Sequence, residues 1–581
     1  MTVWTSPYPP LAADGRSLPE LVLAAAGRAP GAAALVDAAS GDAVTYATLA
    51  ARIERVAAGL AELGVAPGDV VAIHAPSIPP WAGVALGAMR AGAAVTGIGP
   101  GATEAEAARQ VAMTGASVLV AAPALAERAL PAAESGTIGA PDAGTARAGE
   151  AGPSGASDAG TANGAPDAGT ARAGEALVSG VVPVRSAGAR GLRAVVAIGE
   201  AAGTRPIAEL LASTAPAPRV ALDPERVALL PCSSGTTGLP KAVVLTHGNL
   251  AAGVAQVRCG LRFEPRDVVL AMAPPAHVMG FVGGLAAPLA AGSTVVLLPR
   301  FELPALLAAI ARHRVTVLIV PPPVAAALAA ADGHDLSSLE LVVVGGAALH
   351  PALQARLAAR LRGAVIGQGY GMTETTLPIP VPDRRAGTSP GAAGRLAPGT
   401  ELRVVDPATG RDAPEGELWV RGPQVTPGYL GRPDATAELI GPGGWLRTGD
   451  LGSVDDAGEV RVVDRLKELI KVNALQVAPA ELEALLLSRP DVADAAVVGR
   501  HDPRTGEAPI AFVVARGRLD PAAVAAWVAE RVAPHKRLAA VVPIEAIPRT
   551  PSGKPLRRRL RALAAAPAAG AAPAPASVAA G

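Results

Sequence analysis

The feature that most constrains the fold is an alternation of amphipathic stretches and short apolar runs over the first 380 residues. An amphipathic stretch such as 18–30 predicts a helix, whereas an apolar run such as 69–76 predicts a buried strand. Further strands of this kind are predicted at 192–199, 226–233, 315–323 and 339–349. Because strands that alternate with helices form layered sheets, we expect an α/β fold in this region.

The pattern changes in the second half of the chain. Short alternating strands with turns, between Thr400 and Asp464, predict a short-stranded β subdomain. The segment 465–563 then combines helices and strands in a compact α+β unit. We therefore expect a large N-terminal domain at 1–464, made of α/β subdomains and the β subdomain, and a small C-terminal domain at 465–563.

Two segments lack the composition of a packed core. At 134–176 the sequence is of low complexity, and GAPDAGTARAGEA occurs twice, at 139–151 and 164–176. Such small and polar residues bury too little apolar surface to compensate for chain entropy, so we expect a disordered insert without chemistry. The Ala- and Pro-rich end, 564–581, is expected to be a disordered tail.

Charge and cysteine content narrow the function classes. Fifty-one basic and fifty acidic residues give a net charge of +1, and no basic stripe alternates with aromatic residues. Small molecules are therefore expected partners rather than nucleic acid. The two cysteines, Cys232 and Cys259, form neither a disulfide framework nor a metal-ligand spacing, and the first residues lack a secretory pattern. We expect a cytoplasmic protein, whereas the sequence does not indicate an oligomeric state.

One apolar stretch is long enough to cross a bilayer. No Asp, Glu, Lys or Arg occurs between Val268 and Pro299, yet the stretch contains several Pro and Gly residues that interrupt helices. Its two ends have the composition of short buried strands. We therefore predict two strands flanking a helix and no membrane span.

The strongest local signal is LLPCSSGTTGLPKAVVLTHGNL at 229–250. A strand here runs into hydroxyl and glycine residues and then a lysine: Ser233, Ser234, Gly235, Thr236, Thr237, Gly238 and Lys241. Glycines let backbone N–H groups approach an anion, and the lysine adds a point charge. The residues thus have the composition of a polyphosphate cradle, although the spacing is not that of the common nucleotide P-loop and an isolated SGTTG is more often a surface turn.

Five further motifs follow in a fixed order: GQGYGMTET at 367–375, GELWVRGP at 416–423, GWLRTGD at 444–450, VVDRLKELIK at 462–471 and PRTPSGKPLR at 548–557. Together with SSGTTGLPK they resemble the adenylate-forming (AMP-binding) enzymes, a superfamily of acyl-CoA synthetases, luciferases and peptide-synthetase adenylation domains. Within it the chain is most similar to the 4-coumarate:CoA ligase type, over about 30–560 without the insert.

Lysine usage points the same way. Only five basic residues are lysine, and four of them, Lys241, Lys467, Lys471 and Lys554, lie inside these motifs, whereas Lys536 does not. A compact ammonium fits a tight phosphate or carboxylate site better than a planar guanidinium.

The resemblance implies a two-step reaction. A carboxylic acid attacks ATP to give acyl-AMP and pyrophosphate, and the thiol of coenzyme A then displaces AMP. It implies that Lys554 bridges the carboxylate and the α-phosphate, that Glu374 holds Mg²⁺, and that 233–238 with Lys241 binds the β- and γ-phosphates. Lys471 is expected to serve the second step, for which the mobile C-terminal domain swings about Asp464 and Lys467.

The resemblance also implies nucleotide and acid contacts. Asp450, assisted by Arg465, is expected to accept hydrogen bonds from the ribose hydroxyls. Tyr370 is expected to stack on adenine, and Thr373 is expected to bind the α-phosphate. The remaining implied positions surround the nucleotide, the acyl group or the acid: His277, Met279, Ala347, Ala348, Gln368, Gly369, Gly371, Lys467 and Gln476.

Two departures from the family pattern bear on the substrates. Where CoA ligases have KYKGFQ, this chain has KVNALQ, with Asn473, Ala474 and Leu475 in place of the second lysine, the glycine and the aromatic residue. A ligase that passes the acyl group to an amine or a carrier protein therefore stays an alternative to a CoA ligase. A third interpretation is a non-catalytic nucleotide-binding homologue. In AHVMG, Met279 replaces a tyrosine and offers no hydrogen-bond donor, which favours a less polar aryl, alkenoic or aliphatic acid over a 4-hydroxycinnamate.

Overall fold

The computed structural model describes residues 2–11, 15–134, 192–233, 240–473, 475–550 and 553–565. The predicted insert lies outside these ranges apart from Glu134, which ends a helix. The last helix continues to Ala565, so the first two residues of the predicted tail are helical, and the rest of that tail also lies outside the described residues.

The first sheet has the strand order β10-β11-β9-β5-β4-β6-β7-β8, and β21 pairs with β11. Its central strands run parallel, as expected for buried apolar runs joined by helices. The strands are β4 (Val70–His74), β5 (Ala94–Ile98), β6 (Ala116–Ala121), β7 (Ala194–Ala197), β8 (Arg205–Pro206), β9 (Val227–Leu229), β10 (Cys232–Ser233), β11 (Lys241–Thr246) and β21 (Gly428–Tyr429). The helices of this region are α1 (Leu18–Arg28), α2 (Tyr46–Glu62), α3 (Pro80–Arg90), α4 (Glu104–Thr114), α5 (Pro123–Glu134) and α6 (Ile207–Leu211).

The second sheet has the order β16-β15-β14-β12-β13-β2-β3 and is parallel except at β3. Its strands are β2 (Ala33–Asp37), β3 (Ala43–Thr45), β12 (Val268–Ala271), β13 (Thr294–Leu297), β14 (Val317–Val320), β15 (Leu341–Val344) and β16 (Val365–Gln368). The associated helices are α7 (His247–Leu261), the π-helix η2 (Met279–Ala286), α8 (Ala287–Ala291), α9 (Leu303–His313), α10 (Pro322–Ala330) and α11 (Pro351–Arg360).

The apolar stretch 268–299 is part of this sheet. It supplies β12 and β13 with a helical segment between them, which confirms that prediction. Within the described part of the chain, none of the helices combines the length and apolar character needed to cross a bilayer.

Small residues let these layers pack closely. A Cβ added at Gly87 would lie 2.6 Å from Val56, where α3 packs on α2. A Cβ at Gly59 would lie 2.6 Å from the backbone of Leu210 in α6. The Trp81 ring, 5.5 Å from the Phe281 ring, is one of the few large anchors of this core, as expected from an aromatic content of 2%.

An antiparallel sheet follows in the order β1-β19-β20-β22-β23. Its strands are β1 (Trp4–Thr5), β19 (Glu401–Val405), β20 (Glu415–Arg421), β22 (Leu446–Val454) and β23 (Val460–Arg465), and the small elements nearby are η3 (Thr373–Thr375), β17 (Pro380–Val381), β18 (Arg395–Leu396), α12 (Pro433–Leu439) and η4 (Pro442–Gly444). The predicted short-stranded β region therefore exists.

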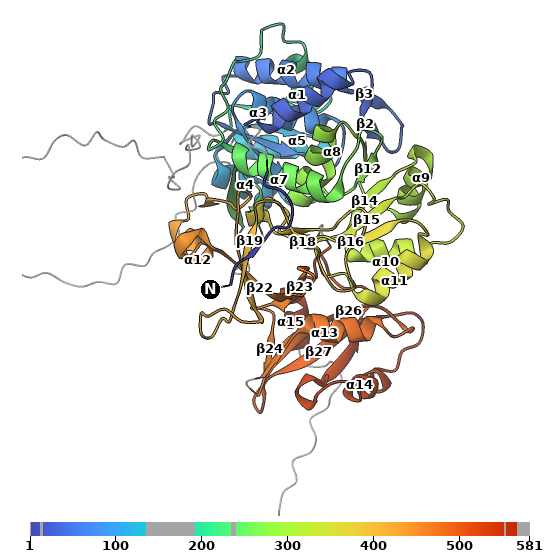
Figure 1. Cartoon of the computed structure of the whole chain (residues 1–581). Coiled ribbons are helices and arrows are strands. Elements are labelled where there is room, and N and C mark those ends of the chain that lie inside the picture. Colours follow the sequence, from blue (N-terminus) through green and yellow to red (C-terminus); the bar gives the residue numbers. More distant parts are fainter. Residues whose placement is uncertain are drawn as a thin grey trace, which may run out of the picture.

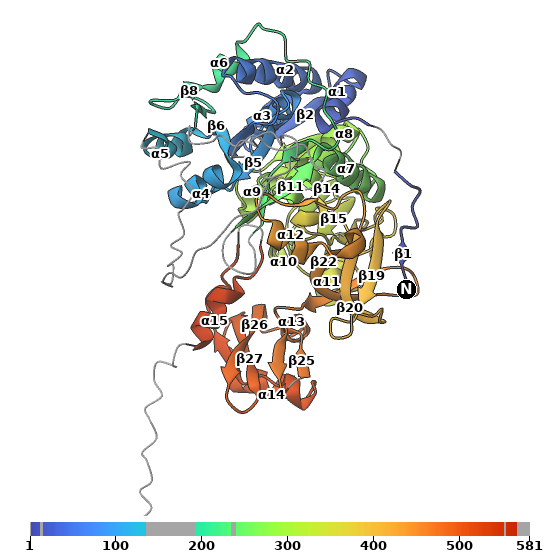
Figure 2. The ribbon, with the colours of Figure 1, turned by 90° about the vertical axis from the view of Figure 1, so that its left-hand side faces the viewer.

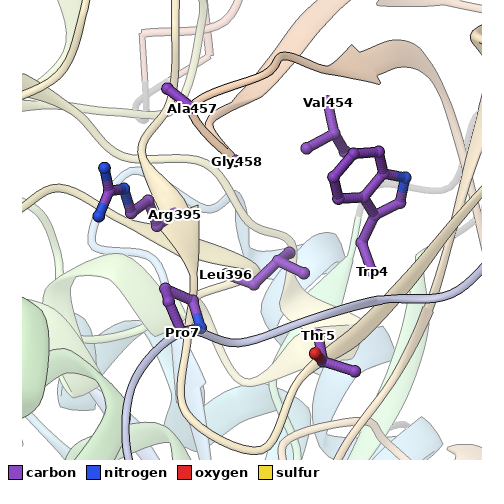
Figure 3. A pocket seen from close by; sticks show the side chains of 8 residues that line it. All are labelled: Trp4, Thr5, Pro7, Arg395, Leu396, Val454, Ala457 and Gly458. Atoms are coloured by element: carbon purple, nitrogen blue, oxygen red, sulfur yellow. The ribbon is translucent and has the colours of Figure 1, made fainter.

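A cavity of about 90 Å³ lies beside this sheet's edge strand, with the Trp4 ring next to Val454 (Figure 3). The cavity contains none of the predicted site residues; its lining is Trp4, Thr5, Pro7, Arg395, Leu396, Val454, Ala457 and Gly458.

The C-terminal region forms a sheet of its own in the order β25-β24-β27-β26, with β28 beside β27. Its elements are β24 (Ile470–Val472), β25 (Leu475–Val477), α13 (Pro479–Leu487), β26 (Val492–Asp502), β27 (Gly506–Ala515), α14 (Pro521–Ala529), η5 (Pro534–Lys536), β28 (Ala540–Pro543) and α15 (Arg557–Ala565). Two apolar clusters, one around Leu482 and Val513 and one around Phe512 and Leu560, give it a separate core. Figures 1 and 2 show it below the two parallel sheets in both views, so the fold is α/β with a large N-terminal and a smaller C-terminal part.

Candidate active site

Glu374, Tyr429 and Lys241 are joined in one chain of contacts. Glu374 lies in η3, just beyond the end of β16, and is only 6% exposed. Tyr429 enters from β21, where it pairs with Val243 of β11, and its hydroxyl donates to Oε1 of Glu374 at 2.8 Å. The ammonium of Lys241 lies 4.8 Å from the centre of the Tyr429 ring. Burial and the charge of Glu374 raise the pKa of Tyr429, so the hydroxyl stays a donor.

A second group surrounds Asp450. In the β22–β23 register Asp450 lies opposite Arg465, whose Nε is 2.9 Å from Oδ1 of the carboxylate. The hydroxyl of Tyr370 donates to Oδ2 of the same carboxylate at 2.7 Å. Burial, together with the charge of Asp450, raises the pKa of Tyr370 well above its ordinary value. The carboxylate is therefore buried and is fixed in orientation by Arg465 and Tyr370.

The segments after β15 and β16 meet at one edge of the second sheet. Gln368 accepts a hydrogen bond from the Leu349 N–H at 2.6 Å, which fixes the loop that carries Ala347 and Ala348. The N–H of Gly369 donates to the carbonyl of Val344 at 2.9 Å. The neighbouring strands are parallel, so their carboxyl ends present both loops on the same side, where ligands of α/β sheets bind.

Gly371 and Met279 complete this edge. A Cβ at Gly371 would lie 1.3 Å from the carbonyl oxygen of Leu377, so only glycine fits there. A Cβ at Gly345 would be 3.5 Å from the sulfur of Met279, which places the thioether beside the β15 loop. Thr373, at the start of η3, is half-buried in the same segment.

Lys554 reaches this group from the C-terminal region. A Cβ at Gly553 would lie 2.8 Å from Cβ of Pro321, so the loop rests on the start of α10. The side chain keeps access to solvent, yet the protein around it desolvates the ammonium and lowers the pKa of Lys554. Arg465 lowers it further, whereas Asp450, Glu374 and Glu468 raise it.

His277 lies within the field of the same ammonium. Burial lowers the pKa of His277, and Lys554 lowers it further. The structure therefore brings together seven of the predicted residues: Lys241, Glu374, Tyr370, Asp450, Arg465, Lys554 and His277.

Lys471 and Gln476 lie elsewhere. They face each other across the β24–β25 hairpin and are both exposed. Within the described ranges, no hydrogen bond or ion pair joins either side chain to Glu374, Asp450 or Lys554. Lys467 is exposed on the segment before this hairpin, and Asn473 occupies its turn with φ +50°.

The carboxylate of Asp464 lies where β23 leads into the C-terminal sheet. It accepts hydrogen bonds from the N–H of Arg465 at 2.7 Å and of Ala480 at 2.9 Å. Burial raises the pKa of Asp464 to about 6.

Most of the predicted phosphate cradle lies outside the described residues, namely Ser234, Gly235, Thr236, Thr237 and Gly238, and so does Ala474 of the hairpin. Ser233 is described: it ends β10 and pairs with Lys241. The cradle prediction therefore stays a prediction.

The donor set suits a magnesium ion that is bound mainly by phosphates. Among the residues that the structure describes, no group of three or more His, Cys, Asp and Glu side chains could hold a metal ion. Mg²⁺ bound with nucleotides needs only one or two carboxylates besides phosphate and water. Glu374 fits this role because Tyr429 occupies Oε1 and leaves Oε2 without that bond.

Sequence reasoning missed Tyr429, which connects Lys241 to Glu374. A usable signal existed, because the chain has only four tyrosines and two of them, Tyr370 and Tyr429, lie in this site. It also missed the contact of Gly553 with Pro321, for which the sequence carries no local signal.

Comparisons with known proteins identify the family of the chain. A family model described as AMP-binding enzyme matches residues 22–430, and one described as AMP-binding enzyme C-terminal domain matches 481–554. The chain is 37% identical to 4-coumarate--CoA ligase 5 of Oryza sativa subsp. japonica, over 92% of each chain, and 35% identical to 4-coumarate-CoA ligase 1 of Narcissus pseudonarcissus, over 92% and 91%. Among solved structures it is similar to the amide bond synthetase McbA of Marinactinospora thermotolerans, with 29% identity, a TM-score of 0.76 and coverage of 94% of this chain and 99% of the other.

Proposed function

The chain belongs to the AMP-binding enzyme family, and from this premise we propose that it is an ATP-dependent carboxylic acid–CoA ligase of the 4-coumarate:CoA ligase type. The carboxylate of the acid attacks the α-phosphate of ATP, which gives acyl-AMP and pyrophosphate. The thiol of coenzyme A then attacks the acyl carbon and releases AMP. The observation that carries the proposal is that the loop of Lys554 rests on Pro321 of the N-terminal region, where the charges of Asp450 and Glu374 act on the Lys554 ammonium.

In the first step two anions must approach each other. The ammonium of Lys554 makes no hydrogen bond or ion pair within the described residues, so its charge is available to the carboxylate and the α-phosphate. Lys241, with the cradle at 233–238, binds the β- and γ-phosphates. Magnesium, when bound, supplies further positive charge against the phosphates, and Glu374 holds it.

The nucleoside is bound by the second group. Asp450, fixed by Arg465 and Tyr370, has the buried carboxylate that ribose hydroxyls need as acceptor. Since the Tyr370 hydroxyl is used by Asp450, the tyrosine ring is left for adenine. Thr373 binds the α-phosphate, and Gln368 with Gly369 holds the β15 loop around the nucleotide.

The acid binds beside Met279, Ala347, Ala348, Gly371 and His277. The Met279 thioether beside Gly345 offers no hydrogen-bond donor to a phenol. A less polar aryl, alkenoic or aliphatic acid is therefore the proposed substrate.

The second step uses the residues that are exposed here. Lys471, Gln476 and Lys467 lie on the segment that follows Asp464, and a swing of the C-terminal part about Asp464 would exchange them for Lys554. One fixed geometry could hardly serve both steps, because each requires a different side chain at the same phosphate.

A second candidate keeps adenylation and changes the acceptor to an amine or a carrier protein. Asn473 and Ala474 replace the lysine and glycine of the CoA ligase pattern, and one similar structure is an amide bond synthetase. The proposed location is the cytoplasm, which is supported by the free thiols of Cys232 and Cys259.

The test separates the two steps. Acid-dependent exchange of pyrophosphate into ATP, measured over a panel of acids, reports adenylation and identifies the acid. Lys554→Ala should abolish this exchange while CoA thioester formation from supplied acyl-AMP stays largely intact, and Lys554→Arg should not restore the exchange. Equal loss of both steps would contradict the separate roles. Acyl-AMP that accumulates with CoA but gives no thioester would favour the second candidate.

A further inference from the structure

Hydrogen bonds join the described residues on the two sides of Lys554, 548–550 and 553–556, here called the Lys554 loop. The Thr550 N–H donates to the carbonyl of Lys554 at 2.8 Å, and the Leu556 N–H donates to the carbonyl of Pro548 at 2.8 Å. The Lys554 N–H in turn donates to Oγ1 of Thr550 at 3.1 Å. Because the ammonium of Lys554 has no hydrogen bond or ion pair within the described ranges, the backbone of this loop determines where it lies.

Arg549 ties this loop to the C-terminal sheet. One terminal nitrogen of its guanidinium donates to both carboxylate oxygens of Asp494, on β26, at 2.8 and 2.9 Å. The other donates to the carbonyl of Gly553 at 2.8 Å, one residue before Lys554. The Arg549 side chain is only 20% exposed, so these charge-assisted bonds are partly shielded from water.

The opposite side of the loop meets the N-terminal region. Gly553 lies against Pro321 and Pro323 at the start of α10, with φ +86°. The loop is thus held between a proline surface and an arginine clamp, and Lys554 projects from it.

We propose that Arg549 is a positioning residue for adenylation, which acts by fixing the Gly553 carbonyl to β26 and thereby setting the height of Lys554 above the acid and the α-phosphate. This inference rests on the proposed function. A planar guanidinium bonds the sheet and the loop at once through two nitrogens at a fixed angle. A lysine at the same position would reach one of the two partners.

The test compares the two half-reactions in Arg549→Ala, in the full-length protein with Mg²⁺, ATP and the preferred acid. We expect acid-dependent pyrophosphate exchange to fall about 10- to 100-fold through kcat, because displacement of a catalytic group by about 1 Å costs rates of this order. The KM for ATP should stay within about twofold, since the Arg549 guanidinium is already bonded to Asp494 and Gly553, and thioester formation from supplied acyl-AMP should be unchanged. The rate of pyrophosphate exchange in Arg549→Lys should lie between the rates of the wild type and of Arg549→Ala.

The chain offers a matched control. Arg489 forms a bidentate ion pair with Asp491 in the same C-terminal region, with side-chain exposures of 15% and 31% against 20% and 30% for the Arg549–Asp494 pair. Arg489→Ala should therefore cost comparable stability and leave adenylation at the wild-type rate. If Arg549→Ala does not fold, Asp494→Asn carries the test, because it weakens the clamp and keeps the Gly553 bond.

Three results would overturn the inference: wild-type exchange in Arg549→Ala, equal loss of both half-reactions in that variant, or the same loss of exchange in Arg489→Ala. Failure of the proposed function looks different, because the wild-type protein itself would then show no acid-dependent exchange.

Discussion

Replacement of Gly553 by alanine tests how the Lys554 loop rests on the N-terminal region. The added Cβ would lie 2.8 Å from Cβ and 3.2 Å from Cγ of Pro321. The ring of Pro321, the N-cap residue of α10, cannot rotate away, so the loop must withdraw by about 0.6 Å to reach an ordinary contact of about 3.4 Å. Lys554, the next residue, moves with it.

Two costs arise, and they act on different properties. Alanine at φ +86° is strained by about 1–2 kcal/mol, but this strain exists wherever the C-terminal part lies and therefore lowers stability. The contact with Pro321 exists only while the loop is docked, and therefore lowers adenylation. Since a displacement near 1 Å costs about 100-fold, we expect exchange to fall about 10- to 100-fold, or about 1.4–2.7 kcal/mol of barrier.

Two further variants isolate the contact. Gly517 has φ +99° and open space around it, so Gly517→Ala carries the strain without the contact and should adenylate normally. Pro321→Gly removes both clashing atoms and should restore exchange to Gly553→Ala in the double variant. Pyrophosphate exchange and thioester formation from supplied acyl-AMP are measured for Gly553→Ala, Gly517→Ala, Pro321→Gly and the double variant Gly553→Ala/Pro321→Gly. Normal exchange in Gly553→Ala, or no recovery in the double variant, would refute the docking argument.

Three other outcomes follow from single contacts. Tyr429→Phe keeps the ring over Lys241 but removes the donor to buried Glu374, so kcat/KM for adenylation should fall about 10- to 100-fold, and an unchanged value would contradict that role. Arg384→Ala leaves the fully buried Asp267 carboxylate without its two 2.6 Å bonds and should cost about 3–5 kcal/mol of unfolding free energy in urea; a loss below 1 kcal/mol would be evidence against it. The pKa of Asp464 is raised from an ordinary 3.8 to about 6, so the folded protein binds this proton more tightly than the unfolded chain does. The protonated carboxyl therefore adds stability that is present below about pH 4 and is lost as the pH rises through 6. Relative to Asp464→Asn, the wild type should lose about 2 kcal/mol between pH 4 and pH 7, and a pH-independent difference would exclude this linkage.

The parts of the fold that depend on local pattern could be predicted. The strands at the two ends of 268–299 followed from apolar runs bounded by Pro and Gly, and the structure has them at β12 and β13. Gln368 and Ala347 were expected near the nucleotide only from the family resemblance, and the structure places both at the carboxyl ends of the neighbouring parallel strands β16 and β15. The helix between β12 and β13 was predicted without its π form, in which a Cβ at Gly280 would lie 2.3 Å from the Pro274 carbonyl oxygen.

The contacts that complete the site could not be predicted in the same way. Each of these contacts joins residues that are 55 positions apart in the sequence: Tyr429 with Glu374, and Arg549 with Asp494. Their meeting depends on how β21 pairs with β11 and how the loop after β28 returns to β26, which no local pattern records. Arg549 also had no compositional signal, because it is one of 46 arginines, whereas the five lysines were conspicuous by their scarcity.

The structure gives that scarcity a physical meaning. Arginines here bind protein carboxylates: Arg465 holds Asp450, Arg384 holds Asp267 and Arg549 holds Asp494. A guanidinium suits this task because its fixed fork matches a carboxylate and keeps it in one orientation. Lys241 and Lys554 instead make no ion pair with a carboxylate among the described residues, and their compact charges can follow phosphate oxygens that move during the reaction. Lys536 lies outside the motifs and differs in this respect. Its ammonium donates to both carboxylate oxygens of Glu481, at 2.7 and 2.6 Å. These arginines therefore fix protein carboxylates, whereas Lys241 and Lys554 have no carboxylate partner among the described residues, as the proposed binding of phosphates requires.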